Sequence, residues 1–256
     1  MPKVNSSFYK NLLAPKRNKA ISSQGLIVHY ELGSQQSYPG SGLVLYDISG
    51  KANNATFASE LIYNPAPGYL DFEGTVQSVD YFTIPSTWHS GNFTTGMSFN
   101  IWLKSNVTRG VFKSNFGSLS INYQPNSSQF KITVTTTVLS GTAKNLRTNT
   151  FTFITPVKWI MITGVYENSN KALKIYVDGV LSSTATNTLI PGTYFKSSAP
   201  TYIVVGRSNG NGAETDSWFY KGSLGSFRIY DQAITAEAID LIYNEEKIKY
   251  SALGLS

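Results

Sequence analysis

The stretch "KIYVDGVLSSTATN" (residues 174–187) predicts a strand, a two-residue turn and a returning strand. Val177 and Val180 flank Asp178 and Gly179. Asp-Gly between β-branched residues is a strong hairpin signal, because both central residues of the preferred turn need a positive φ. Acidic residues are scarce, 15 in 256, so Asp178 could serve either chemistry or the turn. Since no second carboxylate with a catalytic context accompanies it, we predict a turn residue.

Short segments of the same kind on both sides of this hairpin predict an all-β protein. From Gly25 onward, β-branched and aromatic runs such as "GLIVHYEL", "MSFNIWLKS" and "WIMITGVYE" are separated by Gly, Pro, Asn and Ser. Turn signals about every ten residues, with no helical pattern between them, are typical of an antiparallel sandwich or barrel. Phe99 and Ile101 alternate with Ser98 and Asn100, so we expect one face of each strand to be buried.

One short helix is predicted near the C-terminus, in "TAEAIDLIYNEEKI". Thr235 can cap its N-terminus, and Glu237 lies in the first turn, where the helix dipole favours an anion. Ile239, Ile242 and Tyr243 form an apolar stripe that would pack on the sandwich.

Composition excludes several classes of site. The chain is 41% hydrophobic with 14 Phe, 16 Tyr and 4 Trp, as expected of a packed globular protein. It has no cysteine, which excludes disulfides and thiolate metal sites. Its two histidines, His29 and His89, lie in no nucleophile motif, and a zinc site is disfavoured. His29 alternates with apolar residues, so we interpret it as a packed or surface imidazole.

The N-terminus carries most of the net charge of +6. Residues 1–20 hold five of the 21 basic residues and no acid, which leaves 16 basic against 15 acidic residues elsewhere. We therefore predict a basic N-terminal arm (1–24) and a single jelly-roll domain (25–256). The arm suits docking on an acidic surface, and the alternative is a solvated, frayed terminus. The predicted docking residues, basic or apolar, are Lys3, Phe8, Tyr9, Lys10, Leu12, Leu13, Lys16, Arg17 and Lys19.

The N-terminus also lacks the continuous apolar core of a signal peptide, and no run approaches the roughly 20 apolar residues of a membrane span. We expect no membrane span and no secretory leader. Direct nucleic-acid binding by the arm is not favoured, because five charges would give weak and strongly salt-dependent binding.

Catalytic residues are not predicted. Glycoside hydrolysis generally needs two carboxylates, whereas residues 81–166 contain no Asp or Glu, and an E-x-D-x-x-E strand is absent from the sequence. The Gly-rich "GRSNGNGAE" (206–214) lacks the Lys-Ser/Thr ending of a phosphate-binding loop. We therefore expect a protein that is not an enzyme.

A calcium site is possible but not favoured in "YDISGKANNATF" (46–57), where Asp47, Ser49, Asn53 and Asn54 share one loop. Oxygen ligands of these types suit a hard cation, but one carboxylate is little charge for such a site. The favoured alternative is that these side chains bond to their own backbone and stabilise the loop. No cofactor is predicted.

The four tryptophans fall into two pairs. Trp102 and Trp159 lie inside apolar strands and are expected in the core, whereas Trp88 and Trp218 lie beside loops. Aromatic rings at such positions can contact a sugar, so Trp88 and Trp218 are candidate glycan contacts.

Eight segments appear in the order of one known family and cover nearly everything from Gly25 to Tyr243. They are "GLIVHYEL", "SYPGSGLVLYDISGKANNATF", "YLDFEGTVQSVDYFTIP", "MSFNIWLK", "WIMITGVYE", "LKIYVDGV", "YIVVGRS" and "GSLGSFRIYDQAITAEAIDLIYN". The set resembles the laminin-G-like, pentraxin-containing branch of the concanavalin A-like jelly rolls. This resemblance implies an antiparallel β-sandwich with a C-terminal helix. The chain departs from pentraxins in lacking their cluster of calcium-binding acids.

Two functions follow from the resemblance. The variant with "SYPGSG" ahead of "YDISGKANNATF" is similar to domains in structural proteins of tailed phages and large DNA viruses. The first hypothesis is therefore a non-enzymatic virion protein, made in the host cytoplasm and docked by its arm on capsid or tail proteins. The second is a carbohydrate-binding module for host-surface or extracellular glycans. A homo-oligomer is compatible with both.

Overall fold

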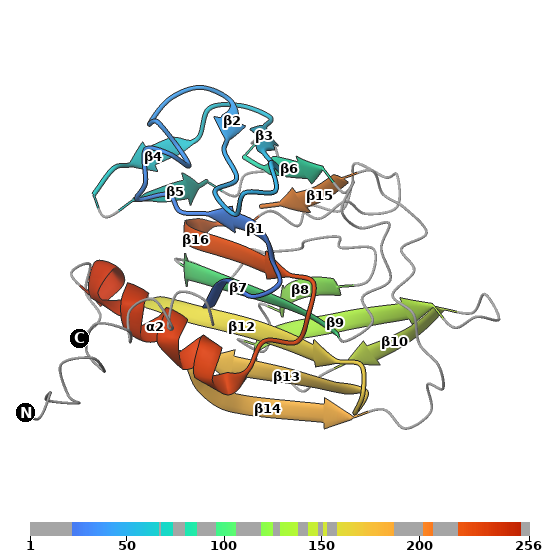
Figure 1. The fold of residues 1–256 in the computed structure, drawn as a ribbon. Helices are drawn as coiled ribbons and strands as arrows, with labels where there is room; N and C mark the ends of the chain where they lie inside the picture. The colour runs from blue at the N-terminus through green and yellow to red at the C-terminus, as the bar shows by residue number, and fades with distance from the viewer. Residues whose placement is uncertain are drawn as a thin grey trace, which may run out of the picture.

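A computed structural model describes residues 22–66, 68–73, 80–85, 96–105, 119–124, 129–137, 143–147, 151–152, 158–186, 202–206 and 220–251. These residues form three antiparallel sheets and the C-terminal helix α2 (Figure 1). The predicted all-β sandwich with one C-terminal helix is confirmed.

The largest sheet has the strand order β14-β13-β12-β7-β16-β5-β4, and β1 also pairs with β16. Strands from both ends of the chain thus lie side by side, since β1 pairs with the second half of β16 and β5 with the first half. The strands of this sheet are β1 (Leu26–Tyr30), β4 (Ile62–Asn64), β5 (Tyr69–Phe72), β7 (Gly96–Ser105), β12 (Trp159–Glu167), β13 (Ala172–Val177), β14 (Val180–Thr186) and β16 (Gly222–Tyr230).

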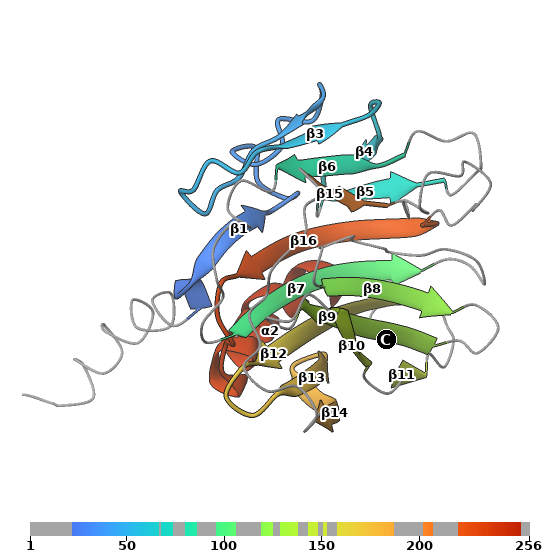
Figure 2. The same cartoon turned by 90° about the vertical axis from the view of Figure 1, so that its right-hand side faces the viewer.

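Two smaller sheets complete the sandwich. One has the order β15-β6-β3-β2, and in the other β9 pairs with β8, β10 and β11. In Figures 1 and 2 the sheet built around β9 lies over one face of the large sheet, and α2 lies over the opposite face. The bounds are β2 (Val44–Leu45), β3 (Ala55–Phe57), β6 (Phe82–Pro85), β8 (Leu119–Gln124), β9 (Gln129–Thr137), β10 (Ala143–Arg147), β11 (Phe151–Thr152), β15 (Tyr202–Val205) and α2 (Ala236–Ser251).

The main core lies between the large sheet and the β2-β3-β6-β15 sheet. Phe99 and Ile101, which the alternation of β7 predicted as buried, are inaccessible to solvent and pack in one cluster with Phe57, Phe82 and Leu45. Burial of a large apolar side chain contributes roughly 1.5–3 kcal/mol each, so this cluster is the main source of stability.

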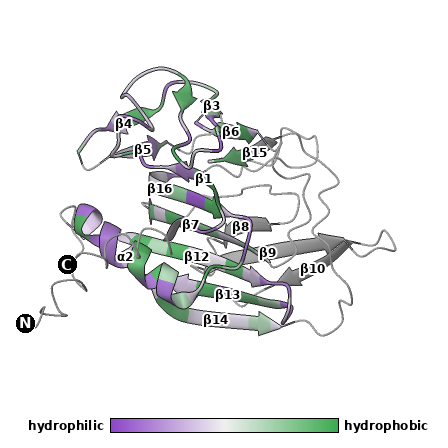
Figure 3. Cartoon of the chain, in the orientation of Figure 1, coloured by the Kyte–Doolittle hydropathy of each residue, from purple (hydrophilic) through white to green (hydrophobic). Residues whose placement is uncertain are grey.

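A second core lies beneath α2. Trp102 and Trp159, predicted to be core residues, pack there with Met161 and with Ile239 and Ile242 of the helix. Figure 3 shows hydrophobic residues along β12 and β13 and a mixture of hydrophilic and hydrophobic residues along α2.

The expectation that each strand buries only one face is wrong for the central strands. Ser98 and Asn100 are inaccessible to solvent, although their alternation with apolar residues placed them on the polar face of β7. The physical reason is that α2 covers this face, which the pattern within one strand cannot reveal. Every residue of β16 is buried as well.

Helix α2 begins as predicted, because the Ala238 N–H donates to Thr235 Oγ1 at 3.1 Å. The predicted stripe faces the sheet, with Ile239 and Ile242 buried. The helix runs further than predicted, to Ser251, and its last turns add Glu246 and Tyr250 to the buried face.

Candidate functional site

Asp178 is a turn residue, as predicted. It has φ of 50° and Gly179 has φ of 83°, the two positive values that this hairpin turn requires. Asp178 Oδ1 also accepts a hydrogen bond from Met161 N at 2.8 Å, and Asp178 N donates to Met161 O at 2.9 Å. Burial raises the pKa of the Asp178 carboxyl, while the Met161 N–H and Lys158 oppose this shift. The carboxylate therefore ties the turn to β12.

Asp47 organises the loop in which calcium was considered. Its Oδ1 accepts hydrogen bonds from His29 N at 2.8 Å and Ser49 N at 2.9 Å, and its Oδ2 accepts from Ser49 Oγ at 2.8 Å and Asn53 N at 3.0 Å. Asn54 Oδ1 accepts from Asp47 N at 2.9 Å. These bonds match the favoured alternative, in which the polar side chains stabilise a tight loop. That the chain needs no cofactor stays a prediction.

A row of polar side chains crosses the large sheet beneath α2. In the strand register, His29 lies opposite Arg228, Arg228 opposite Asn100, and Asn100 opposite Thr163. Directly opposed residues share one face of a sheet, so four strands present polar groups to the helix. Asn100 Nδ2 donates to Thr163 Oγ1 at 2.7 Å.

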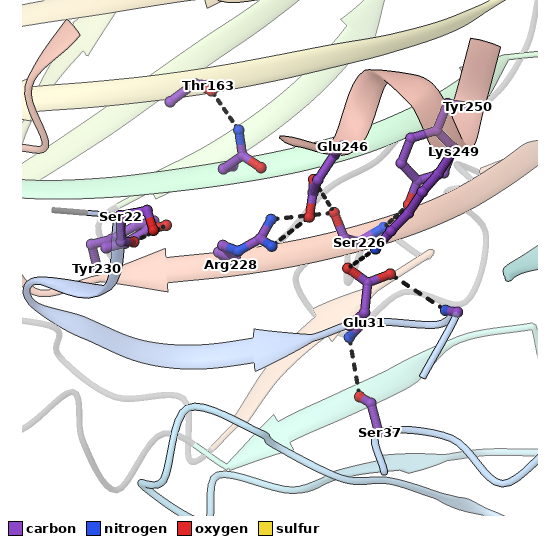
Figure 4. A network of polar contacts seen from close by, with 12 residues as sticks. Ser22, Glu31, Ser37, Thr163, Ser226, Arg228, Tyr230, Glu246, Lys249 and Tyr250 are labelled. Carbon is purple, nitrogen blue, oxygen red and sulfur yellow. Dashed lines mark hydrogen bonds and ion pairs between the residues drawn. The ribbon is translucent and has the colours of Figure 1, made fainter. Parts of the chain in front are cut away.

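Charged groups of this row attach α2 to the sheet (Figure 4). Arg228 forms a buried ion pair with Glu246 of the helix. Ser226 Oγ donates to the other carboxylate oxygen of Glu246 at 2.7 Å, and Ser226 N donates to Tyr250 Oη at 2.8 Å. We use the name α2 clasp for Ser226, Arg228, Glu246 and Tyr250 together with His29, Glu31 and Lys249.

The clasp is electrically balanced when His29 is neutral. Lys249 Nζ lies 3.0 Å from Glu31 Oε2, so two cations face two carboxylates. Burial, and then the charge of Arg228, lower the pKa of His29 to about 2, which keeps its imidazole neutral. Burial alone would raise the pKa of Glu246, but Arg228 holds it at about 2. Burial raises the pKa of Glu31.

Three clasp groups are near enough to bind a metal ion, which sequence reasoning missed because they come from distant segments. Ligand atoms of His29, Glu31 and Glu246 lie within 4.8 Å of one another. His29 Nε2 has no hydrogen-bond partner among the described residues. Both carboxylates, however, are already paired with Arg228 and Lys249. A divalent ion would add uncompensated positive charge in a buried site, so we interpret the cluster as a structural clasp around a packed histidine.

A second polar group lies on the same face of the large sheet, near the start of β16. Ser223 of β16 lies opposite Asp71 of β5 and also opposite Lys104 of β7. Asp71 Oδ1 accepts from Ser223 Oγ at 2.5 Å, and its Oδ2 accepts from Asn64 Nδ2 at 2.9 Å. The half-buried Tyr69 ring packs edge-on against Trp159, with ring centroids 5.4 Å apart. We call Asn64, Tyr69, Asp71, Lys104 and Ser223 the Asp71 row.

Sequence reasoning did not find the Asp71 row. Strand β4, which supplies Asn64, has only three residues and no apolar run that predicts a strand. The row also depends on pairing between segments far apart in the chain. Only the alternation in "YLDFEG" indicates that Asp71 faces away from the main core.

The residues predicted to contact partners lie outside the described residues. These are the arm residues Lys3 to Lys19 and the candidate glycan contacts Trp88 and Trp218. Their roles stay predictions.

This antiparallel sandwich defines a jelly-roll protein, and sequence comparison agrees. Residues 76–240 match the family described as the concanavalin A-like lectin/glucanases superfamily, within its laminin-G group. The chain therefore belongs to the concanavalin A-like lectin/glucanase superfamily, and the predicted resemblance is confirmed. No curated protein sequence matches the chain.

Solved structures with this fold include binding domains of clostridial toxins. The binding domain of botulinum neurotoxin DC, solved in complex with SialylT, matches with a TM-score of 0.61 and 13% identity over 88% of this chain and 52% of that one. A structure of botulinum neurotoxin type C, which depends on two ganglioside molecules to enter cells, matches with a TM-score of 0.64 and 14% identity over 89% and 52%. The binding domain of Paraclostridial Mosquitocidal Protein 1 matches with a TM-score of 0.63 and 13% identity over 88% and 53%.

The chain thus spans about half the length of these solved chains. At this identity the likeness concerns the fold. None of the described helices is long and apolar enough to cross a membrane.

Proposed function

We propose that this protein is a non-enzymatic binding module whose ligand is a glycan. The observation that carries the proposal is the likeness of nearly the whole chain to binding domains of toxins, one solved with SialylT and another dependent on gangliosides. The match covers about half of each toxin chain, so their ligands support the proposal without locating a site.

Four carboxylates of the described residues have structural roles, which favours binding over hydrolysis at their positions. Asp47 and Asp178 hold backbone in loops, and Glu31 and Glu246 attach α2. None of these groups forms the open pair of carboxylates that glycoside hydrolysis uses. The absence of an E-x-D-x-x-E segment from the whole sequence favours the same conclusion.

A glycan array probed with the purified full chain tests this function. We propose Trp88 and Trp218 as contacts, and Trp88→Ala and Trp218→Ala are tested separately. Loss of a contacting aromatic ring should weaken binding about tenfold. Tyr46→Ala is the matched control, since it removes a ring that is 44% exposed elsewhere. An array without a signal for the wild-type chain would contradict the function.

The second candidate is a virion structural protein docked on capsid or tail proteins. The observation that favours it is the set of five basic residues without an acid in residues 1–20. Deleting residues 1–20 should then abolish attachment to particles while the thermal melt stays unchanged. Equal occupancy of the deleted and full chains on purified particles would overturn this role. Both roles are compatible in one protein, because the arm and the jelly roll are separate parts of the sequence.

A further inference from the structure

The Asp71 row lies on the sheet face that α2 covers, but beyond the last turn of the helix. Tyr250, in that turn, packs on Trp102 and Trp159 with ring centroids 4.4 and 4.8 Å apart. Lys104 follows Trp102 by two residues on β7 and lies opposite Trp159. Asn64, Tyr69, Asp71 and Lys104 are each partly exposed to solvent.

The Asp71 carboxylate is held in one orientation. Its two hydrogen bonds come from neighbouring strands on either side, Asn64 on β4 and Ser223 on β16. A carboxylate has about four acceptor positions, so both oxygens retain capacity for further donors. A group fixed by strands loses little conformational entropy when a ligand binds.

The two charges of the row are not neutralised by each other. Among the described residues, the ion pairs involve neither Asp71 nor Lys104. The single strand β16 separates them, with Ser223 opposite both. Neighbouring strands are about 4.8 Å apart, which puts the two backbones roughly 10 Å from each other. A sugar ring with hydroxyls on both edges fits this spacing, since it can donate to Asp71 and accept from Lys104.

Tyr69 supplies the apolar component that sugar binding also needs. Its half-buried ring is fixed by the edge contact with Trp159 at 5.4 Å, and it comes two residues before Asp71 on the same strand face. Ligand sites commonly combine aromatic surface with a few fixed polar groups.

We propose that the Asp71 row is a glycan-binding surface, in which Asp71 accepts hydrogen bonds from adjacent sugar hydroxyls, Lys104 donates one, and Tyr69 contacts the apolar face of the ring. This inference rests on the proposed glycan-binding function and assigns it a place.

The test uses the glycan that gives the strongest array signal with the wild-type chain. Titration calorimetry then measures the affinity of each variant for this glycan. Asp71→Asn should weaken binding about tenfold or more, because it removes a charged acceptor. Lys104→Gln should weaken binding less, about threefold to tenfold. Lys104 is not a core residue, so this substitution leaves the core packing unchanged. The melting temperatures should stay within about 3 °C of wild type. Asp240→Asn and Lys51→Gln, at exposed positions elsewhere, are the matched controls and should bind like wild type.

The outcomes separate the surface from the function. A wild-type chain that binds a glycan, together with Asp71→Asn and Lys104→Gln variants that bind within about twofold of it, would overturn the surface and leave the proposed function standing. A wild-type chain that binds no glycan would overturn both. Weaker binding by Trp88→Ala with unchanged binding by Asp71→Asn would likewise overturn the surface.

Discussion

The α2 clasp and the Asp71 row occupy the same face of the same sheet and are built from the same kinds of residue. In the clasp, Arg228 and Glu246 are buried and paired with each other. In the Asp71 row, Asp71 and Lys104 are partly exposed and form no ion pair with a described residue. The difference is the cover that α2 provides. A polar row under the helix contributes to structure, whereas the row beyond the helix is partly exposed and is the one that we propose to bind a ligand.

Removing one partner of the clasp should have the largest effect. Glu246→Ala leaves the Arg228 guanidinium buried without its counter-charge, which costs about 3–5 kcal/mol of unfolding free energy. Urea denaturation monitored by circular dichroism measures the loss. Glu245→Ala, on the exposed side of the same helix, is the control and should cost under about 0.5 kcal/mol.

The matching substitution in the open region sharpens the contrast. Asp71→Asn should cost about 1 kcal/mol or less, because solvent reaches the carboxylate. Equal losses for Glu246→Ala and Asp71→Asn would show that the helix does not make the difference. The double variant Arg228→Met with Glu246→Leu should recover much of the single-variant loss, since no charge is then left unpaired.

Acid should destabilise the covered region through His29. Its pKa is about 2 in the folded chain, against an ordinary value of 6.5 for histidine, so below pH 6.5 the unfolded chain takes up a proton that the folded chain does not. This stability is present above pH 6.5 and is lost as pH falls, by about 1.4 kcal/mol per pH unit. Glu246 adds to the loss below its ordinary pKa of 4.5, while Glu31, whose pKa is raised, opposes it.

Comparison with His29→Gln isolates the histidine. The other clasp groups and His89 are present in both chains, so the difference in unfolding free energy reports His29. Wild type should lose about 2–3 kcal/mol more than the variant between pH 6.5 and 4.5. Parallel stability curves for the two chains over this range would rule out a buried, neutral His29.

A substitution where α2 packs against β16 should have an intermediate effect on stability. A Cβ added at Gly225 would lie 2.4 Å from Tyr250 Oη, and Tyr250 is held by its contacts with Trp102 and Trp159. Gly225→Ala should therefore cost about 1–3 kcal/mol by overpacking. Thermal denaturation tests this, with Tyr250→Ala as the companion change that removes the whole ring, since its Cε1 and Cζ would also lie 2.6 Å from the added Cβ. If Gly225→Ala is equally costly with and without Tyr250→Ala, the clash is not the cause.

Local signals predicted the hairpin and the helix start, whereas the two polar groups depend on distant pairing. Asp178 and Gly179 define a turn within two residues, and Thr235 caps α2 within one turn. The clasp needs the register of β1, β7 and β16 and the docking of α2, and these relations join segments far apart in the chain. Polar residues of β7 therefore looked solvent-exposed, and the three residues of β4 showed no strand pattern. The fold class was predictable, but the position of the candidate site was not.

The smallest expected effect falls on Asp178, at the rim of the region that α2 covers. A Cβ added at the neighbouring Gly179 would lie 3.3 Å from Tyr243 of α2, so the hairpin tip touches the helix. Asn tolerates the positive φ of 50° nearly as well as Asp does, and its Oδ1 can accept the Met161 N–H. Because burial raises the pKa of the Asp178 carboxyl, the neutral amide also avoids a desolvation cost. Asp178→Asn should change the unfolding free energy by less than about 0.5 kcal/mol.

Gly179→Val is the contrasting change at the same turn, since a β-branched residue at φ of 83° is strained by about 1–3 kcal/mol. Chemical denaturation of both variants tests the pair. A loss above about 1 kcal/mol for Asp178→Asn would mean that the charge itself holds the hairpin against β12. If that variant instead lost glycan binding while its stability stayed unchanged, Asp178 would have a role in ligand binding. This result would contradict its assignment as a turn residue.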